Sequence, residues 1–124
     1  MAKLPLYEPY LTEYERASLI RCFESGWISS ASPQVREFED SFKRRFSEKP
    51  ETDVAVAVSN GTVALELALL ALGLGDGDYV GVPDLTFAAT INAVINVGAI
   101  PVIFDIDSES WNLDCELLRE EKYP

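Results

Sequence analysis

The sequence contains no histidine, only two cysteines and no long apolar run. The absence of histidine excludes Ser-His-Asp triads, Cys-His pairs and histidine-based zinc sites. Cys22 and Cys115 form no Cys-x-x-Cys pair, so we expect two reduced, buried thiols. No stretch approaches the ~20 apolar residues that span a bilayer, and the first ten residues hold no apolar signal core. We therefore expect no membrane contact and a cytoplasmic location.

Basic residues are also scarce: 10 Lys and Arg stand against 21 Asp and Glu, for a net charge of −11. No basic stripe of the kind that nucleic-acid binding needs is visible, so we expect no nucleic-acid partner. The acidic balance does not prevent phosphate binding, because backbone N–H groups can bind an anion locally. With 124 residues, 48% of them apolar, the chain can form one modest globular domain.

Residues 1–53 are predicted to form a helical N-terminal arm. Thr12 is suited to cap a helix that runs to about Ser25, where Gly26 ends it. A second helix should begin near Pro33, a residue that fits the first helical turn. The spacing of Val35, Phe38, Phe42 and Phe46 puts one apolar face on this helix.

Residues 54–124 change in character and are predicted to form an α/β region. We expect strands at Val54–Val58, Tyr79–Val82 and Ile100–Phe104, with helices at Val63–Leu72, Thr86–Val97 and, more weakly, Leu113–Glu121. The helix at Val63–Leu72 is almost wholly apolar and should be buried on most sides. Helices of this length between strands imply parallel pairing with right-handed crossovers.

The turn between the first predicted strand and the next helix reads Ser59-Asn60-Gly61-Thr62. Ligands of parallel α/β sheets sit beyond the carboxyl ends of strands, and the first N–H groups of a helix have no internal partner. A phosphate could therefore bind there, with Gly61 allowing close approach and the Thr62 hydroxyl donating one more hydrogen bond. An ordinary turn, with Asn60 or Ser59 capping the helix, explains the same residues. The glycine spacing fits neither a dinucleotide fingerprint nor a P-loop.

Two aromatic segments are further candidates. Phe87 follows the second predicted strand, at the same end of the sheet as Gly61, where its ring could stack on a planar cofactor or simply pack beneath the loop. The polar loop that holds Trp27, Ser29 and Ser30 could line a cleft, or Trp27 could anchor the loop to the core.

An acidic pair, Asp105 and Asp107, follows the third predicted strand. Two carboxylates on alternate residues could bind a metal, but one of them usually faces away from the other in a strand. With no His or Cys nearby, a solvated acidic face explains the pair more simply, and we expect no metal site.

Taken together, these segments resemble the DegT/DnrJ/EryC1/StrS family of sugar aminotransferases, which depend on pyridoxal phosphate (PLP). The matching pieces are Gly26-Trp27-Ile28-Ser29-Ser30, Val35-x-x-Phe38-Glu39, Ser59-Asn60-Gly61-Thr62-x-Ala64-Leu65, Gly75-Asp76-Gly77-Asp78, Val82-Pro83-x-x-Thr86-Phe87, Gly98-Ala99-x-Pro101-Val102 and Asp105-Ile106-Asp107. Their order and spacing cover nearly the whole chain, and within the family they look most like synthases of 4-amino-4,6-dideoxy sugars.

The resemblance implies the N-terminal part of the large α/β domain of the aspartate-aminotransferase type (PLP fold type I), with residues 54–124 as its cofactor-phosphate region. It implies that Asn60, Gly61 and Thr62 bind the PLP phosphate and that Phe87 stacks on the pyridine ring. Trp27, Ser29 and Ser30 would lie near the sugar. The implied reaction moves an amino group from glutamate to a nucleotide-linked keto sugar, at the interface of a homodimer.

One departure from the family pattern concerns lysine. The lysines are Lys3, Lys43, Lys49 and Lys122, and none matches the lysine that forms the Schiff base with PLP. We therefore expect an N-terminal fragment that has no catalytic residue, cannot attach PLP covalently and is inactive without a missing C-terminal half. Two alternatives remain open: a module that binds a phosphorylated ligand, and a non-catalytic partner subunit of a full-length family member.

Overall fold

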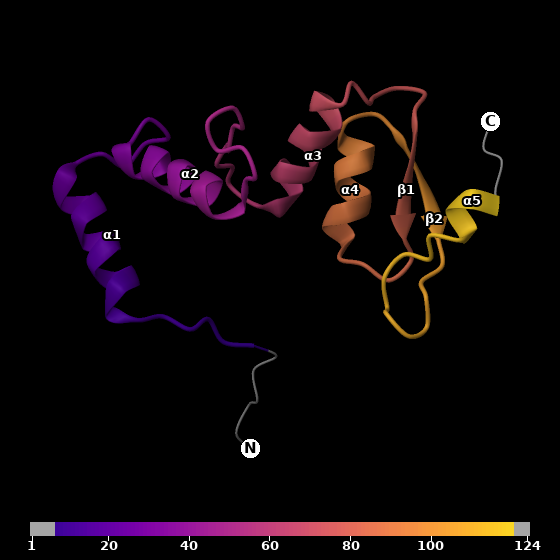
Figure 1. The fold of residues 1–124 in the computed structure, drawn as a ribbon, viewed down its shortest axis with the longest axis horizontal. Helices are drawn as coiled ribbons and strands as arrows, with labels where there is room; N and C mark the ends of the chain where they lie inside the picture. Colours follow the sequence, from indigo (N-terminus) through magenta and orange to yellow (C-terminus); the bar gives the residue numbers. More distant parts are fainter. Residues whose placement is uncertain (1–6, 121–124) are drawn as a thin grey trace, which may run out of the picture. The chain divides into compact units, whose positions relative to one another are not determined.

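The computed structural model describes residues 7–120, which form two compact units that divide between Ala57 and Val58 (Figure 1). The first unit holds helices α1 (Glu13–Ser25) and α2 (Pro33–Phe46). The second holds α3 (Gly61–Ala71), β1 (Tyr79–Pro83), α4 (Ala88–Asn96), β2 (Ile100–Phe104) and the short α5 (Leu117–Glu120). Among residues 7–120, no helix is both long enough and apolar enough to cross a bilayer.

The ends of α1 and the start of α2 lie where the sequence predicts them. The Thr12 hydroxyl accepts from the N–H of Tyr14, and the Glu15 carboxylate accepts from the N–H of Thr12, which completes a capping box. Gly26 ends α1 in the left-handed conformation, with φ of 70°. Pro33 opens α2.

The apolar face of α2 is a row of three rings. The ring centroids of Phe38 and Phe42 lie 6.1 Å apart, and those of Phe42 and Phe46 lie 4.6 Å apart. All three rings remain exposed, so the row is not a buried core.

Two expectations for the apolar segments that follow are wrong. Val54–Val58 is not a strand, because neither β1 nor β2 pairs with it and a strand needs a neighbour to satisfy its backbone groups. Helix α3 is not buried on most sides: it packs on α4 along one face, and Leu65, Leu67 and Leu70 are exposed on the rest. Apolar composition alone does not supply the surface that would cover a helix.

The second unit is built on a parallel pair of strands joined through α4. Tyr79 lies opposite Ile100, and the register continues to Pro83 opposite Phe104. Helix α4 packs on the pair and α3 packs on α4 (Figure 1). The core consists of Val82, Val94 and Ala99, with Leu69, Val80, Ile91 and Val97 packed against it. The predicted α/β class is therefore confirmed.

Three smaller expectations also fail. Phe87, not Thr86, occupies the N-cap of α4, because the Thr86 hydroxyl bonds the Thr90 hydroxyl at 2.9 Å instead of a helix N–H. The last helix begins at Leu117 rather than Leu113, whose backbone forms a bridge with Ile106.

The third concerns the thiols, both of which are free. Cys22 is half-buried, but Cys115 is exposed because it lies in the irregular segment before α5.

Candidate anion-binding edge

The turn before α3 leaves two backbone donors open. Asn60 caps the helix: its side-chain oxygen accepts from the N–H of Val63 at 3.1 Å, and its carbonyl accepts from the N–H of Ala64 at 3.1 Å. Within residues 7–120, no group accepts from the N–H of Gly61 or Thr62, the first two residues of α3. These donors lie at the positive end of the helix dipole, which favours an anion.

Gly61 leaves open space at this end of α3. Its φ is not positive, so the backbone conformation does not require glycine. A Cβ added there would meet nothing within 4 Å, so packing does not require glycine either. The space beside Gly61 is thus available to a ligand that approaches the backbone. This open space, together with the two N–H groups that meet no acceptor in the described part of the chain, fits a phosphate.

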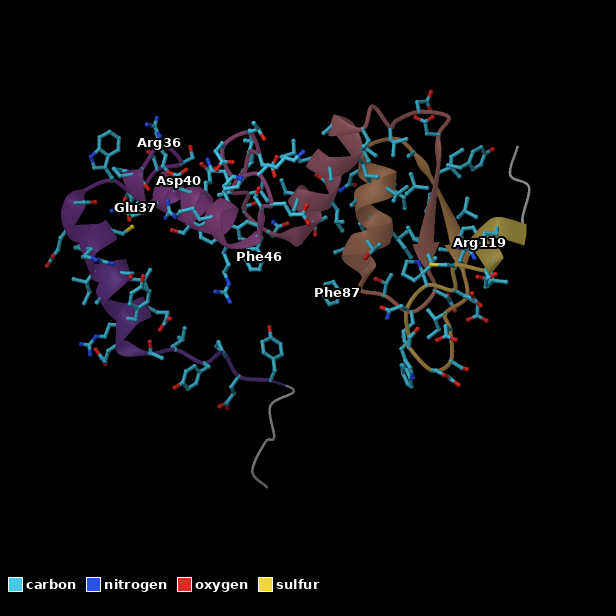
Figure 2. All side chains as sticks on the ribbon, viewed as in Figure 1. Arg36, Glu37, Asp40, Phe46, Phe87 and Arg119 are labelled. Carbon is cyan, nitrogen blue, oxygen red and sulfur yellow. The ribbon has the colours of Figure 1, made fainter. Side chains whose placement is uncertain are left out.

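Phe87 stands at the start of the neighbouring helix and does not pack beneath its loop. The ring is 83% exposed, and the residue is the N-cap of α4 with no side-chain capping bond. Figure 2 shows the ring projecting outward beside the first turn of α4. The structure therefore favours an exposed ring over the packing alternative.

Gly61 and Phe87 lie at the same edge of the second unit. Helices α3 and α4 run in the same direction, and their N-terminal ends lie at the end of the unit where β1 and β2 finish (Figure 1). The expectation that the two residues share an edge is met. Such an edge is where parallel α/β sheets bind ligands.

Trp27, Ser29 and Ser30 lie in the loop between α1 and α2, in the first unit. Trp27 is half-exposed, with its backbone N–H donated to the Ser25 hydroxyl at 3.2 Å. The Ser29 carbonyl accepts from the N–H of Ser32 at 3.0 Å, which tightens the loop. These residues and the Gly61 edge belong to different units.

The two aspartates after β2 are engaged with local backbone. Asp105 accepts from the N–H of Ile106, and Asp107 accepts from the N–H of Ser110 at 2.7 Å. The backbone bond from Ser110, assisted by its side chain, lowers the pKa of Asp107 below its ordinary value. Both carboxylates therefore shape the turn between Ile106 and Leu113.

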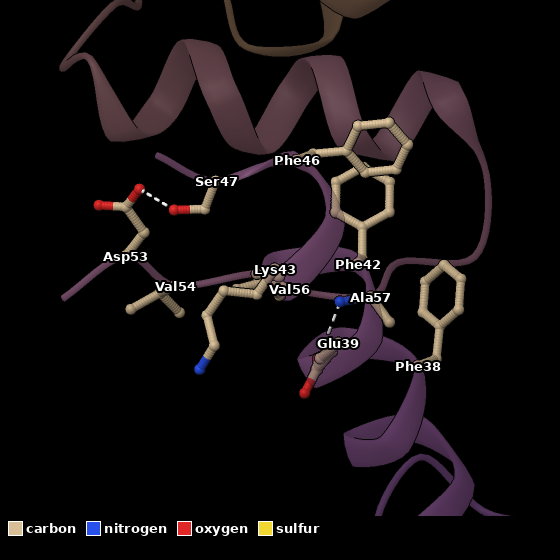
Figure 3. A pocket seen from close by; sticks show the side chains of 11 residues that line it. Phe38, Glu39, Phe42, Lys43, Phe46, Ser47, Asp53, Val54, Val56 and Ala57 are labelled. Atoms are coloured by element: carbon tan, nitrogen blue, oxygen red, sulfur yellow. Dashed lines mark hydrogen bonds between the residues drawn. The ribbon is translucent and has the colours of Figure 1, made fainter. Parts of the chain in front are cut away.

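Within the first unit, a bond between distant residues was not foreseen from the sequence. The Glu39 carboxylate of α2 accepts from the N–H of Ala57 at 2.8 Å (Figure 3). One indication of it was available in the sequence: Glu39 follows Phe38 and so lies beside the apolar face of the predicted helix. That position alone does not reveal which N–H the carboxylate meets.

Comparison with known proteins agrees with this arrangement. A sequence model of the DegT/DnrJ/EryC1/StrS aminotransferase family matches residues 9–121. GDP-perosamine synthase of Escherichia coli O157:H7 is 44% identical over 121 residues, which cover 98% of this chain and 32% of that protein. The chain thus spans about a third of the length of the curated relatives it matches.

Solved structures give the same result. The sugar aminotransferase Spr1654 of Streptococcus pneumoniae, in its PMP form, superposes with a TM-score of 0.78 at 35% identity, over 96% of this chain and 29% of that one. The GDP-4-keto-6-deoxy-D-mannose-3-dehydratase of E. coli, with bound hydrated PLP, gives 0.82 at 26% identity, over 99% and 32%. The predicted fold, the N-terminal part of a PLP fold type I domain, is confirmed.

Proposed function

Because this chain belongs to the DegT/DnrJ/EryC1/StrS aminotransferase family, we propose that it forms the phosphate-holding part of a PLP-dependent sugar aminotransferase. The observation that carries the proposal is the open start of α3, where the N–H groups of Gly61 and Thr62 meet no acceptor among the described residues. Related solved structures in the PMP form or with bound hydrated PLP support the choice of cofactor.

Each residue of the edge has a distinct part in this proposal. The N–H groups of Gly61 and Thr62 and the Thr62 hydroxyl donate to the phosphate, and Asn60 holds the turn in shape by capping α3. The exposed Phe87 ring would stack on the pyridine ring of the coenzyme and exclude water from that face. When bound, the coenzyme supplies the electron sink that lets an amino group move between an amino acid and a keto sugar.

The substrates belong to the proposal as well. We assign glutamate as amino donor and a nucleotide-linked keto sugar as acceptor, with Trp27, Ser29 and Ser30 beside the sugar, in the cytoplasm. The name of the E. coli relative, GDP-perosamine synthase, supports a GDP-linked sugar.

No catalytic residue is assigned within residues 1–124. Lys43 pairs with Asp40 at 3.4 Å on α2, and Lys49 lies in the connector that follows. Lys3 and Lys122 lie outside the described residues. The chain by itself is therefore expected to bind the coenzyme without a covalent bond and to transfer no amino group.

Association with a partner polypeptide is part of the proposal. Leu67, Leu70 and Leu72 are exposed on and just after α3, and this apolar surface supports association with a second copy or with the C-terminal part of the family fold. The same surface suits the alternative in which the chain is a non-catalytic subunit of a full-length member.

The test is a calorimetric titration with pyridoxamine 5′-phosphate, which has no aldehyde and cannot form imines with surface lysines. We expect binding at least about tenfold tighter than that of pyridoxamine, because only the phosphate reaches the helix end. Thr62→Val should weaken binding about fivefold and Thr62→Ser less than about twofold, since the lost group is one hydroxyl donor. Ser108→Ala is the matched control, a hydroxyl removed from the exposed turn after β2. Equal affinity for both ligands would contradict the proposal.

A further inference from the structure

Helix α3 is almost wholly apolar, so hydrophobic contact does not determine which of its faces turns toward α4. Leu69 packs against the core of the second unit, whereas Leu65, Leu67 and Leu70 are exposed elsewhere on the helix. The hydrophobic effect depends on the apolar area that is buried and has no direction. Rotation or sliding of α3 on α4 exchanges one leucine for another at a small cost in buried area, so another interaction must set the position of the helix.

Glu66 is the one charged residue of α3, and it forms a bond to α4. Its carboxylate accepts from the side-chain N–H of Asn96 at 2.5 Å. The two residues lie 30 positions apart in the chain and belong to the same compact unit. Every other hydrogen bond between two side chains, in the part of the chain that the structure describes, joins residues at most six positions apart. The Glu66–Asn96 bond is therefore a directional link between two helices, which local chain geometry does not explain.

Both of the linked helices begin at the candidate anion-binding edge and run in the same direction (Figure 1). Glu66 lies in the second turn of α3, which starts at Gly61, and Asn96 is the last residue of α4, whose N-cap is Phe87. The Asn60 cap shapes the turn before α3 but does not set its distance from Phe87. Because a helix moves largely as a rigid element, a bond between α3 and α4 also constrains the separation of their starts.

We infer that Glu66 and Asn96 are positioning residues, which together set the separation between the N–H groups of Gly61 and Thr62 and the Phe87 ring. The inference rests on the proposed function, in which the phosphate binds at the turn and the pyridine ring stacks on Phe87. A ligand that reaches both places gains the second contact as an intramolecular one, but only where the separation matches its length. An anion that reaches the turn alone gains nothing from the separation.

The test compares a ligand that reaches both places with one that reaches only the turn. These ligands are pyridoxamine 5′-phosphate and inorganic phosphate, and the amide chemical shifts of Gly61 and Thr62 report the binding of each. Glu66→Met keeps the length of the side chain but removes the acceptor. We expect it to weaken pyridoxamine 5′-phosphate binding about fivefold and to change phosphate binding by less than about twofold. Glu66→Gln keeps an acceptor oxygen and should change both by less than about twofold.

Substitution of the donor tests whether the pair, and not Glu66 alone, is responsible. Asn96→Ala should also weaken pyridoxamine 5′-phosphate binding about fivefold, and the double variant with Glu66→Met should bind no more weakly than either single variant, because both changes remove the same bond. The matched control is Asn92→Ala, since Asn92 is exposed on the same helix and its side chain forms no hydrogen bond within residues 7–120. Additive losses in the double variant would contradict the inference.

A measurement on the unchanged chain covers the case in which the variants do not fold. Coupling between two sites is reciprocal, so saturation with pyridoxamine 5′-phosphate must slow exchange of the Asn96 side-chain amide protons, and saturation with inorganic phosphate must not. The side-chain amide of Asn92 is the internal reference and should not change. Equal slowing by the two ligands, or no slowing by either, overturns the inference.

The outcomes separate the inference from the proposed function. If the unchanged chain binds pyridoxamine 5′-phosphate no better than pyridoxamine, both fall. If it binds the phosphate form selectively and Glu66→Met leaves that binding unchanged, or weakens it as much as it weakens phosphate binding, only the positioning role falls. A loss confined to pyridoxamine 5′-phosphate, with affinity restored in Glu66→Gln, supports the inference.

Discussion

The two compact units differ in the interactions that determine their structure, which are local in the first unit and between distant segments in the second. In the first unit, Ser32 is the one buried side chain among the described residues, and the helices are delimited by local devices at Thr12, Gly26 and Pro33. In the second unit lie all the buried apolar residues of the described chain, which are Val82, Ala93, Val94, Ala99 and Phe104. Caps and prolines set where a helix begins and ends, but only pairing between distant segments makes a core.

This contrast bears on function. The candidate anion-binding edge belongs to the unit with the core, where α4 packs on the β1–β2 pair and α3 packs on α4. In the first unit, the last residue, Ala57, is held to α2 by a bond from its N–H to the Glu39 carboxylate. The second unit is therefore held together by packing between strands and helices, whereas Ala57 in the first unit is held by one side-chain bond.

The largest effect is expected from a charge placed in the core of the second unit. Ala93 is 0% exposed, so Ala93→Asp buries a carboxylate without a partner and should cost about 3 kcal/mol or more. The neighbouring Asn92 is exposed, and Asn92→Asp is the matched control, with an expected cost below about 0.5 kcal/mol. Amide exchange should speed up in β1 and β2 but not in α1. Equal acceleration in all three would show that the units are not independently stabilised.

A smaller effect is expected in the first unit, where the side chains are only partly covered. Phe42 is 49% exposed and lies between two rings, so Phe42→Ala should destabilise α2 by about 1–2 kcal/mol. Phe23, on α1, is 81% exposed and serves as the control, with an expected loss below about 0.5 kcal/mol. Amide exchange within α2 measures the difference. Similar values for the two variants would mean that the ring row contributes no stability.

The fold was predictable from the sequence where the determinants are local. Thr12, Gly26 and Pro33 mark helix ends by their own chemistry, and the apolar runs that became β1 and β2 were bounded by turn residues. The strand predicted at Val54–Val58 failed for the opposite reason. Its residues favour extended backbone, but pairing depends on a neighbour that the local sequence does not reveal.

The candidate site was predictable only in part. The sequence predicted that Gly61 and Phe87 share an edge because successive parallel βα units place their turns at the same end. The two residues do share an edge, although the strand expected before Gly61 is absent among the described residues and the agreement rests on the common direction of α3 and α4. The Glu39 bond to Ala57 spans 18 residues and has no sequence signature. The binding roles of Asn60, Gly61, Thr62, Phe87 and the Trp27 loop stay predictions.

The smallest expected effect is on the pKa of one acidic residue in each unit, Glu15 in the first and Asp107 in the second. Hydrogen bonds from the Thr12 side chain and then its backbone lower the pKa of Glu15, and bonds from the Ser110 backbone and then its side chain lower that of Asp107. The ordinary pKa is 4.5 for Glu15 and 3.8 for Asp107. When folding lowers the pKa of an acid, the stability that the acid contributes is fully present above the ordinary pKa and is lost as the pH falls through the lowered pKa. We therefore expect α1 and the turn after β2 to loosen in acid, not in base.

Substitution of the donors distinguishes the two acids. Thr12→Ala removes the main cause for Glu15, a side-chain bond, so the pKa of Glu15 should rise most of the way to its ordinary value. Ser110→Ala leaves the backbone N–H that dominates at Asp107, so the pKa of Asp107 should rise only slightly. Carboxyl ¹³C shifts followed through an acid titration measure both. A larger rise for Asp107 than for Glu15 would mean that the side chain of Ser110, rather than its backbone, holds the acid in the second unit.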